Sequence, residues 1–341
     1  MAKAFGAYGA VQGLAAAAGP LLGGFLVDAD LGGLGWRTIF WVNVPVAVVA
    51  LVAGGRFLPE SSAFRRTALD LTGVALSAAA VLLILLPLVQ GMDWGWPWWG
   101  FALMAAGVAV MGAFLRHERR LATLGGTPLL DPALLGVRSF SAGLLASLFF
   151  FGAIGDFFLT LSIYLQSGTG RTATGTGLVI LPYAIGSMLT SGLGVALAAR
   201  AGRTLLVGGS LTLAVSQAVL WFVVRDGQET GYWSLAVALL IGGLGLGLAA
   251  PILVNVVLAG VPRRDAGAAG GVLTTVTQIG GAVGIAVLGT IFFTKLASGE
   301  GSRLQVHGDA FSLVLLVEVA LYVVAAALML LLPRTAAAYE G

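Results

Sequence analysis

The sequence predicts an all-α integral membrane protein, a helical bundle of about ten transmembrane helices. Three features indicate this class: 58% of the 341 residues are apolar, only 10% are charged, and 51 are glycine. A soluble domain has about 25% charged residues, so most of this surface must face lipid. Glycine weakens soluble helices, but between membrane helices it lets two backbones approach closely.

The spans can be counted because a helix needs about 20 apolar residues to cross about 30 Å of hydrocarbon. The first window follows Lys3 and looks like a signal peptide, but it is too long and has a Gly-Pro pair in place of a cleavage site. The longest polar stretch, about 116–138, is expected to be a linker on the membrane surface. The ten windows are 4–27, 38–56, 70–90, 98–115, 139–166, 173–198, 204–224, 231–260, 267–294 and 310–332.

The positive charges orient these spans, because Lys and Arg near span ends are retained in the cytoplasm. With both termini inside, 13 of the 18 Lys and Arg residues fall in cytoplasmic loops. We therefore expect a multi-pass plasma-membrane protein with both termini cytoplasmic. The outside cations would be Arg37, Arg171, Arg225, Lys295 and Arg303.

The first window contains a spaced set of small residues with one proline: Gly6, Ala15, Gly19, Pro20, Gly23 and Gly24. This set resembles the antiporter motif on the fifth helix of drug exporters in the major facilitator superfamily, with Ala15 where that motif has glycine. The proline kinks the helix, and the glycines give a flat face to a neighbouring helix. A glycine-rich packing face explains any one of these residues; only the whole spacing is specific.

Later segments resemble, in order, the fourteen-helix drug:proton antiporter branch of that superfamily (EmrB/QacA-like). They are 36–45, 69–73, 127–131, 164–166, 177–182, 243–247 and 277–284. The resemblance covers the family's helices five to fourteen, so the first four family helices are expected to be absent. It implies a two-helix remnant of the N-terminal half (1–57), an inserted helix pair with a linker (58–138), a complete C-terminal six-helix half (139–333) and a cytoplasmic tail (334–341).

The implied function is secondary active transport: proton-coupled export of small amphipathic or hydrophobic drug-like compounds. The partners would be the small-molecule substrate, protons, the lipid bilayer and a chain supplying the missing N-terminal helices. Two alternatives stay open, an inactive membrane-inserted remnant and one component of a split transporter.

Two carboxylates lie within predicted spans, where a charge costs about 2.5 to 3.5 kcal/mol. Asp156 is followed by Thr160 and Tyr164 at successive i+4 positions, which predicts a polar stripe. Glu318 lies in the last span. Both are candidates for proton coupling; the alternative is a neutral, hydrogen-bonded carboxyl, or for Glu318 a position at the outer interface.

Neutral polar residues in spans are candidates for the substrate cavity: Asn255, Gln166 and Gln278. Interhelical hydrogen bonding is the more common explanation for such residues. Arg200, Gly202 and Arg203 resemble a degenerate copy of the family's cytoplasmic loop motif, in which Ala199 replaces the carboxylate. Anchoring by positive charge at the membrane surface explains this loop more simply.

We expect no enzyme activity, cofactor or metal site. The predicted topology places His117 and His307 on opposite sides of the membrane, so they cannot share a metal ion. The sequence has no phosphate-binding Gly-x4-Gly-Lys pattern, which argues against an ATP-driven pump. The net charge of +3 is too small to indicate nucleic-acid binding.

Overall fold

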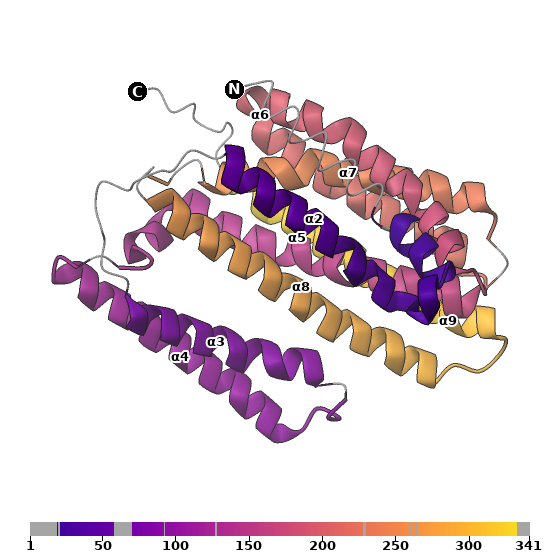
Figure 1. Ribbon diagram of the computed structural model, residues 1–341, viewed down its shortest axis with the longest axis horizontal. Helices are drawn as coiled ribbons and strands as arrows, with labels where there is room; N and C mark the ends of the chain where they lie inside the picture. Colours follow the sequence, from indigo (N-terminus) through magenta and orange to yellow (C-terminus); the bar gives the residue numbers. More distant parts are fainter. Residues whose placement is uncertain are drawn as a thin grey trace.

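Among the residues that it describes, the structure consists of helices and the turns and loops that connect them (Figure 1). This computed structural model describes residue 19 and residues 21–57, 70–91, 93–126, 128–227, 230–258, 261–262 and 265–332, without the side chains of 195, 196 and 198–200. Residues 21–28 are helical and lead into two short 3₁₀ turns, η1 (Leu31–Gly33) and η2 (Gly35–Arg37). The next three helices are α2 (Thr38–Phe57), α3 (Leu71–Gln90) and α4 (Trp98–Thr123).

The second part of the chain forms the main bundle. A short turn, η3 (Pro132–Gly136), leads into α5 (Arg138–Ile163), which continues as one π-helical turn, η4 (Tyr164–Gly168). The 52-residue α6 (Ala173–Val224) is interrupted at Ala201, where φ is −138° and ψ is 25°, and so provides two spans. The last helices are α7 (Tyr232–Leu258), α8 (Ala266–Ala297) and α9 (Arg303–Met329).

Among the described residues, nine helices are long and apolar enough to cross a membrane. They correspond to nine of the ten predicted windows, and the first window, 4–27, lies largely outside the described residues. The linker prediction differs from the structure: residues 116–123 continue α4 as helix, and only the part after Thr123 connects α4 to α5. The polar residues that suggested a linker are the last turns of α4, which continues beyond the predicted apolar window 98–115.

Polar side chains fix where several of these helices begin. The Asp70 carboxylate accepts the Gly73 N–H at 2.9 Å before α3, and the Thr172 hydroxyl accepts the Gly175 N–H at 3.0 Å before α6. Before α9, Ser302 and Gln305 form a reciprocal capping box. Each cap satisfies backbone donors that have no partner within the helix.

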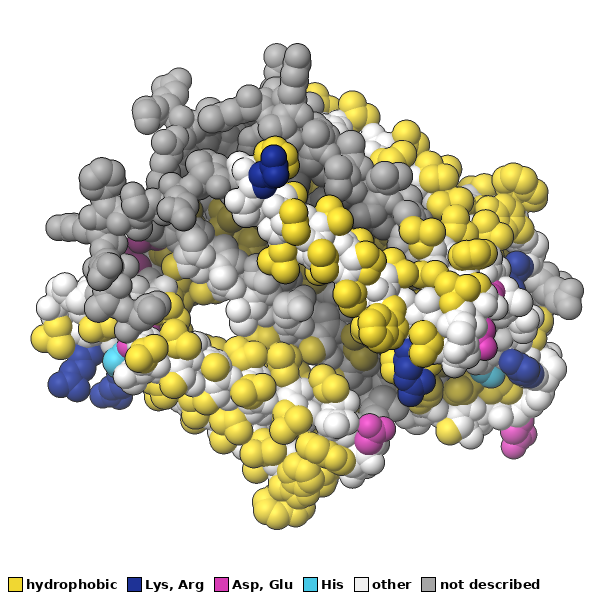
Figure 2. Space-filling model, in the orientation of Figure 1, with side chains coloured by type: hydrophobic (Ala, Val, Ile, Leu, Met, Phe, Trp, Pro, Cys, Tyr) yellow, Lys and Arg dark blue, Asp and Glu magenta, His cyan; other side chains and the backbone are white. Residues whose placement is uncertain are grey.

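The core lies among α5 to α9, where α5 packs on α8 and α9 while α6 packs on α7 and α9. The α3–α4 hairpin stands beside this bundle and reaches it through α8 (Figure 1). Only Thr38 of α2 is buried. On the face seen in Figure 2, hydrophobic side chains cover the helices and most charged side chains gather toward the two ends, as expected for a surface facing lipid.

Contacts between distant segments define the two ends of the bundle. At one end, here called the Arg203 end, the Arg203 guanidinium donates to the carbonyls of Leu330 and Leu332 after α9. At the other, the Arg303 end, Arg303 donates to the Ser167 carbonyl in η4.

Glycines set the distance between the main helices. A Cβ added at Gly284 of α8 would overlap the Gly152 carbonyl oxygen of α5, and a Cβ at Gly155 would lie 2.8 Å from the Gly281 Cα. Backbone contact this close is possible only where both surfaces lack side chains.

We predict that Gly284→Ala destabilises the protein by about 1–3 kcal/mol, because the new methyl group forces α5 and α8 apart. The matched control is Gly281→Ala on the same helix, where an added Cβ meets nothing within 4 Å. This control should stay within about 0.5 kcal/mol of the wild type. Fluorescence-detected size-exclusion chromatography after heating in detergent measures both variants; equal loss in the two would contradict the packing argument.

Candidate functional site

Asp156 of α5 and Glu318 of α9 lie together in the core, although they are 162 positions apart in the chain. Both side chains are fully buried, and none of their four carboxylate oxygens has a hydrogen-bond partner among the described residues. The Asp156 carboxylate is close enough for its charge to act on Glu318. A buried charge is costly unless it is paired, so this site suits a bound proton or a cationic ligand.

Three more buried polar side chains surround this pair. Tyr183 and Tyr322 lie within electrostatic range of Glu318, and Gln217 lies beside Tyr322. Apart from the approach of Gln217 to Tyr322, their hydroxyl and amide groups have no hydrogen-bond partner among the described residues. We call Asp156, Tyr183, Gln217, Glu318 and Tyr322 the buried polar cluster.

The local sequence explains how the cluster is positioned. Glu318 and Tyr322 are one turn apart on α9, so they share a face. Asp156 follows Gly152, which contacts α8, and a Cβ at Gly289 of α8 would lie 3.7 Å from the Asp156 carboxylate. The glycine-rich packing of α5 on α8 therefore brings a flat backbone surface beside Asp156.

Tyr183 is held by two consecutive glycines of α7, Gly242 and Gly243. A Cβ added at Gly243 would overlap the Tyr183 carbonyl oxygen, and one at Gly242 would lie 2.8 Å from its ring. The Tyr183 ring also packs against Phe158 with centroids 5.2 Å apart. Tyr183 is thus fixed between α5 and α7 with its hydroxyl in the core.

Sequence reasoning found Asp156 and Glu318 as candidates, did not count Tyr322 among them, and missed Tyr183 and Gln217. Both lie in predicted spans, and an unpartnered amide or phenol at membrane depth is a functional signal in its own right. Two nearby serines show the contrast: the Ser210 hydroxyl donates to the Tyr322 carbonyl and the Ser216 hydroxyl to the Ala238 carbonyl, both at 2.8 Å. Those two serines are satisfied as interhelical hydrogen bonds.

The residues of the polar stripe predicted along α5 have different surroundings in the structure. The Thr160 hydroxyl donates to the backbone carbonyls of Asp156 and Phe157, at 3.2 and 3.3 Å. The Tyr164 hydroxyl lies 3.3 Å from that of Thr230, and its ring stacks on Phe311 with centroids 5.1 Å apart. Tyr164 therefore belongs to the Arg303 end of the bundle.

The three predicted cavity amides have exposed side chains. Asn255 of α7, Gln278 of α8 and Gln166 of η4 form no side-chain hydrogen bond to another helix within the described ranges. The structure does not bring them into the buried polar cluster. Their exposed side chains face lipid, water or another chain.

Half of the antiporter-like set can be placed: Gly19, Gly23 and Gly24 are described, whereas Gly6, Ala15 and Pro20 lie outside the described residues. A Cβ at Gly24 would overlap the Ala173 carbonyl oxygen at the start of α6. One turn later, the Asp28 carboxylate accepts the Thr174 N–H at 2.7 Å. Hydrogen bonds from the Thr174 side chain and backbone hold the pKa of Asp28 below its ordinary value.

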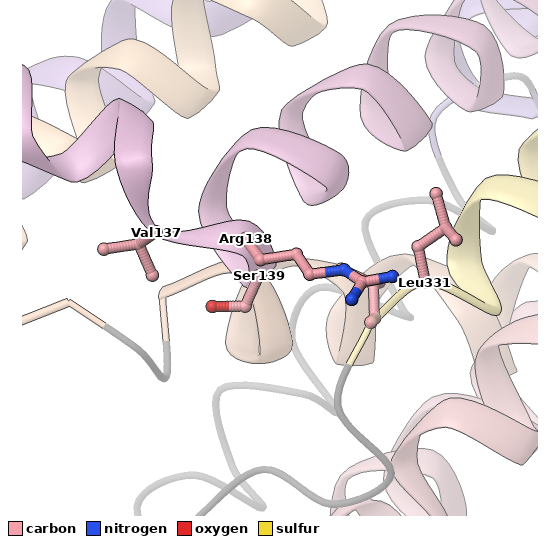
Figure 3. A pocket seen from close by; sticks show the side chains of 5 residues that line it. Val137, Arg138, Ser139 and Leu331 are labelled. Carbon is pink, nitrogen blue, oxygen red and sulfur yellow. The ribbon is translucent and has the colours of Figure 1, made fainter.

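The loop at Arg200, Gly202 and Arg203 lies at the interruption of α6, and the Arg200 side chain is outside the description. Arg203 satisfies carbonyls after α9, which is a structural contact. The start of α5 and the end of α9 line a shallow pocket of about 390 Å³ at the same end, formed by Val137, Arg138, Ser139, Leu331 and Leu332 (Figure 3). No residue of the buried polar cluster lines this pocket.

Comparison with known proteins places this helical architecture in a family. The family model described as Major Facilitator Superfamily matches residues 55–285 and 145–338. The chain is 41% identical over 303 residues to "Probable actinorhodin transporter" of Streptomyces coelicolor, covering 87% of this chain and 52% of that protein.

Two further relatives are 33% identical. "Puromycin resistance protein pur8" of Streptomyces alboniger matches over 355 residues, 99% of this chain and 68% of that protein. "Tetracenomycin C resistance and export protein" of Streptomyces glaucescens matches over 305 residues, 86% of this chain and 53% of that protein. The chain thus spans about half to two thirds of the length of these relatives.

The family and these relatives are transporters and resistance proteins, not enzymes. Together with the nine apolar helices among the described residues, the matches show a multi-pass membrane protein. The chain belongs to the major facilitator superfamily.

Proposed function

We propose that this chain forms all or part of a secondary transporter that exports small amphipathic or hydrophobic compounds in exchange for protons. The observation that carries the proposal is the pair of buried, unpartnered carboxylates of Asp156 and Glu318 inside a bundle of this family. The names of three relatives, which refer to transport, resistance and export of antibiotics, support the substrate class.

In this proposal the buried polar cluster is the proton site. Uptake of a proton neutralises a carboxylate and its release leaves a charge, which at membrane depth costs about 2.5–3.5 kcal/mol. One protonation step could therefore change the ratio of two transporter conformations by about 100-fold, since 1.4 kcal/mol corresponds to tenfold. That difference is large enough to couple proton movement to alternating access.

The proposed division of the chain follows the family resemblance: 139–333 is one six-helix half, and 1–57 belongs to the other half. The Asp28–Thr174 contact joins these two parts. With both termini in the cytoplasm, as the charge distribution favours, the Arg303 end faces outward. The contact then closes the outer side of the transporter in this conformation.

We predict that Asp156→Asn lowers proton-gradient-driven efflux by about tenfold or more. Asparagine keeps the size of the neutral carboxyl but cannot release a proton, so export loses its coupling while downhill movement of the substrate remains. The measurement is efflux of a fluorescent amphipathic cation from proteoliposomes, with and without a pH gradient. Asp309→Asn, the same change at an exposed position of α9, is the matched control. If both variants keep the wild-type pH dependence, Asp156 has no part in coupling.

A second prediction concerns the Asp28 contact. Because its folded pKa is lowered, the contact stabilises this conformation at pH above the ordinary Asp pKa of about 3.9 and is lost only as pH falls through the lowered value. The contact should therefore be constant between pH 5 and 8. Asp28→Ala should raise the population with an open outer side over that whole range.

The chain contains no cysteine, so spin labels can be attached at Leu31→Cys and Leu178→Cys without background. Double electron–electron resonance then gives the distance distribution across the outer side. A longer distance in Asp28→Ala at pH 7 supports the contact as a closing element. An unchanged distribution assigns it no such role.

A further experiment distinguishes an active transporter from the two alternatives, an inactive remnant and one component of a split transporter. We expect efflux only when the four helices that precede this segment in the family are present, either fused to it or co-expressed as a second chain. This expectation follows because alternating access needs two six-helix halves. Full efflux by the chain alone in proteoliposomes would contradict it.

A further inference from the structure

The α3–α4 hairpin brings together three side chains that the sequence separates. Asp70 precedes α3, whereas His117 and Glu118 lie near the end of α4, at the Arg203 end of the bundle. One ligand atom from each residue lies within 4.8 Å of the other two. The site is distinct from the buried polar cluster and shares no residue with it.

The contacts within this group are close. His117 Nε2 lies 3.1 and 3.0 Å from the two carboxylate oxygens of Asp70. The backbone N–H of Gly73 holds the pKa of Asp70 below its ordinary value, so this carboxylate is charged at neutral pH. One oxygen of Glu118, Oε2, accepts the Leu130 N–H at 3.0 Å.

The second oxygen of Glu118 points to a missing ligand. Glu118 is 0% exposed, and its Oε1 accepts no hydrogen bond from a described N–H or O–H donor; the group that it faces is the Asp70 carboxylate. Both carboxylates converge on Gly73, where an added Cβ would lie 2.6 Å from Glu118 Oε1 and would overlap Asp70 Oδ2. Two carboxylates this close repel each other unless a cation or a proton lies between them.

We propose that Asp70, His117 and Glu118 bind one divalent transition-metal ion of the Zn²⁺ class. One imidazole nitrogen and two carboxylate oxygens form a donor set that Zn²⁺ takes, with water completing the tetrahedron. Ligand atoms about 2.0–2.2 Å from such an ion lie about 3.3–3.6 Å apart. The His117–Asp70 spacing needs only a few tenths of an ångström of adjustment to reach that separation.

The position of the site indicates what a bound ion does. Asp70 fixes the start of α3, Glu118 belongs to α4, and Leu130 belongs to the connection between the hairpin and α5. An ion held here would lock three segments at one point. His117 is 29% exposed at its side chain and leaves a path for the ion to enter, whereas the Asp70 side chain is 8% exposed.

The test uses the full chain without an affinity tag, purified in detergent, stripped with a chelator and dialysed. Equilibrium dialysis against Zn²⁺ with elemental analysis should give about one bound ion per chain, and thermal denaturation should shift upward with Zn²⁺. His117→Ala and Glu118→Gln should each weaken Zn²⁺ binding at least tenfold. His307→Ala, which removes the other histidine at the opposite end of the bundle, is the matched control and should bind as the wild type does.

His117→Ala truncates a partly exposed ring and so reports on binding even if Glu118→Gln fails to fold. Absence of stoichiometric Zn²⁺ binding would overturn the proposal and leave a proton shared by the two carboxylates. Equal binding by wild type, His117→Ala and Glu118→Gln would also overturn it. Loss of binding in His307→Ala as large as in His117→Ala would assign the ion to another place.

Discussion

Close contact between helix backbones is the constraint on which this bundle depends. Apolar side chains gain little by leaving lipid for a protein interior, so helices in a membrane associate through packing and hydrogen bonds. The α5–α8 and α6–α7 pairs meet at glycines whose added Cβ atoms would overlap the neighbouring backbone. The same contacts position Asp156 and Tyr183, so the architecture of the core and the geometry of the polar site have one origin.

The two pairs of buried carboxylates differ in their hydrogen bonds. Asp156 and Glu318 are enclosed in the core without any hydrogen bond to their carboxylates among the described residues, which keeps them sensitive to a proton or ligand. Asp70 and Glu118 instead accept backbone hydrogen bonds and lie beside a histidine at the edge of the hairpin. The first arrangement suits a group that changes charge during a cycle; the second suits a fixed structural role.

The spans could be predicted from the sequence because lipid imposes one simple requirement on length and apolarity. That reasoning also placed Asp156 and Glu318 as candidates, since carboxylates stand out against apolar sequence. It could not bring them together, because the side-by-side packing of α5 and α9 depends on tertiary contacts. The pairing of Asp70 with His117 could not be predicted for the same reason, and the two histidines by themselves give no indication of a metal site.

Hydropathy also could not predict where α4 ends. The last turns of this helix carry charged residues and extend beyond the apolar segment. Asn255, Gln166 and Gln278 stay predictions for the substrate cavity. Each stands out in its span, yet each side chain is exposed in the structure. Sequence alone cannot tell a lipid-facing or partner-facing position from a core position on a helix that is apolar on every side.

The interruption of α6 at Ala201 has a mechanical meaning. Two spans follow each other there without a loop, and Arg203 ties the joint to the carbonyls after α9. Because no flexible loop separates the two spans, a tilt or rotation of one span is passed on to the other. A shift of either span at this joint would therefore also displace the end of α9, to which Arg203 is hydrogen bonded.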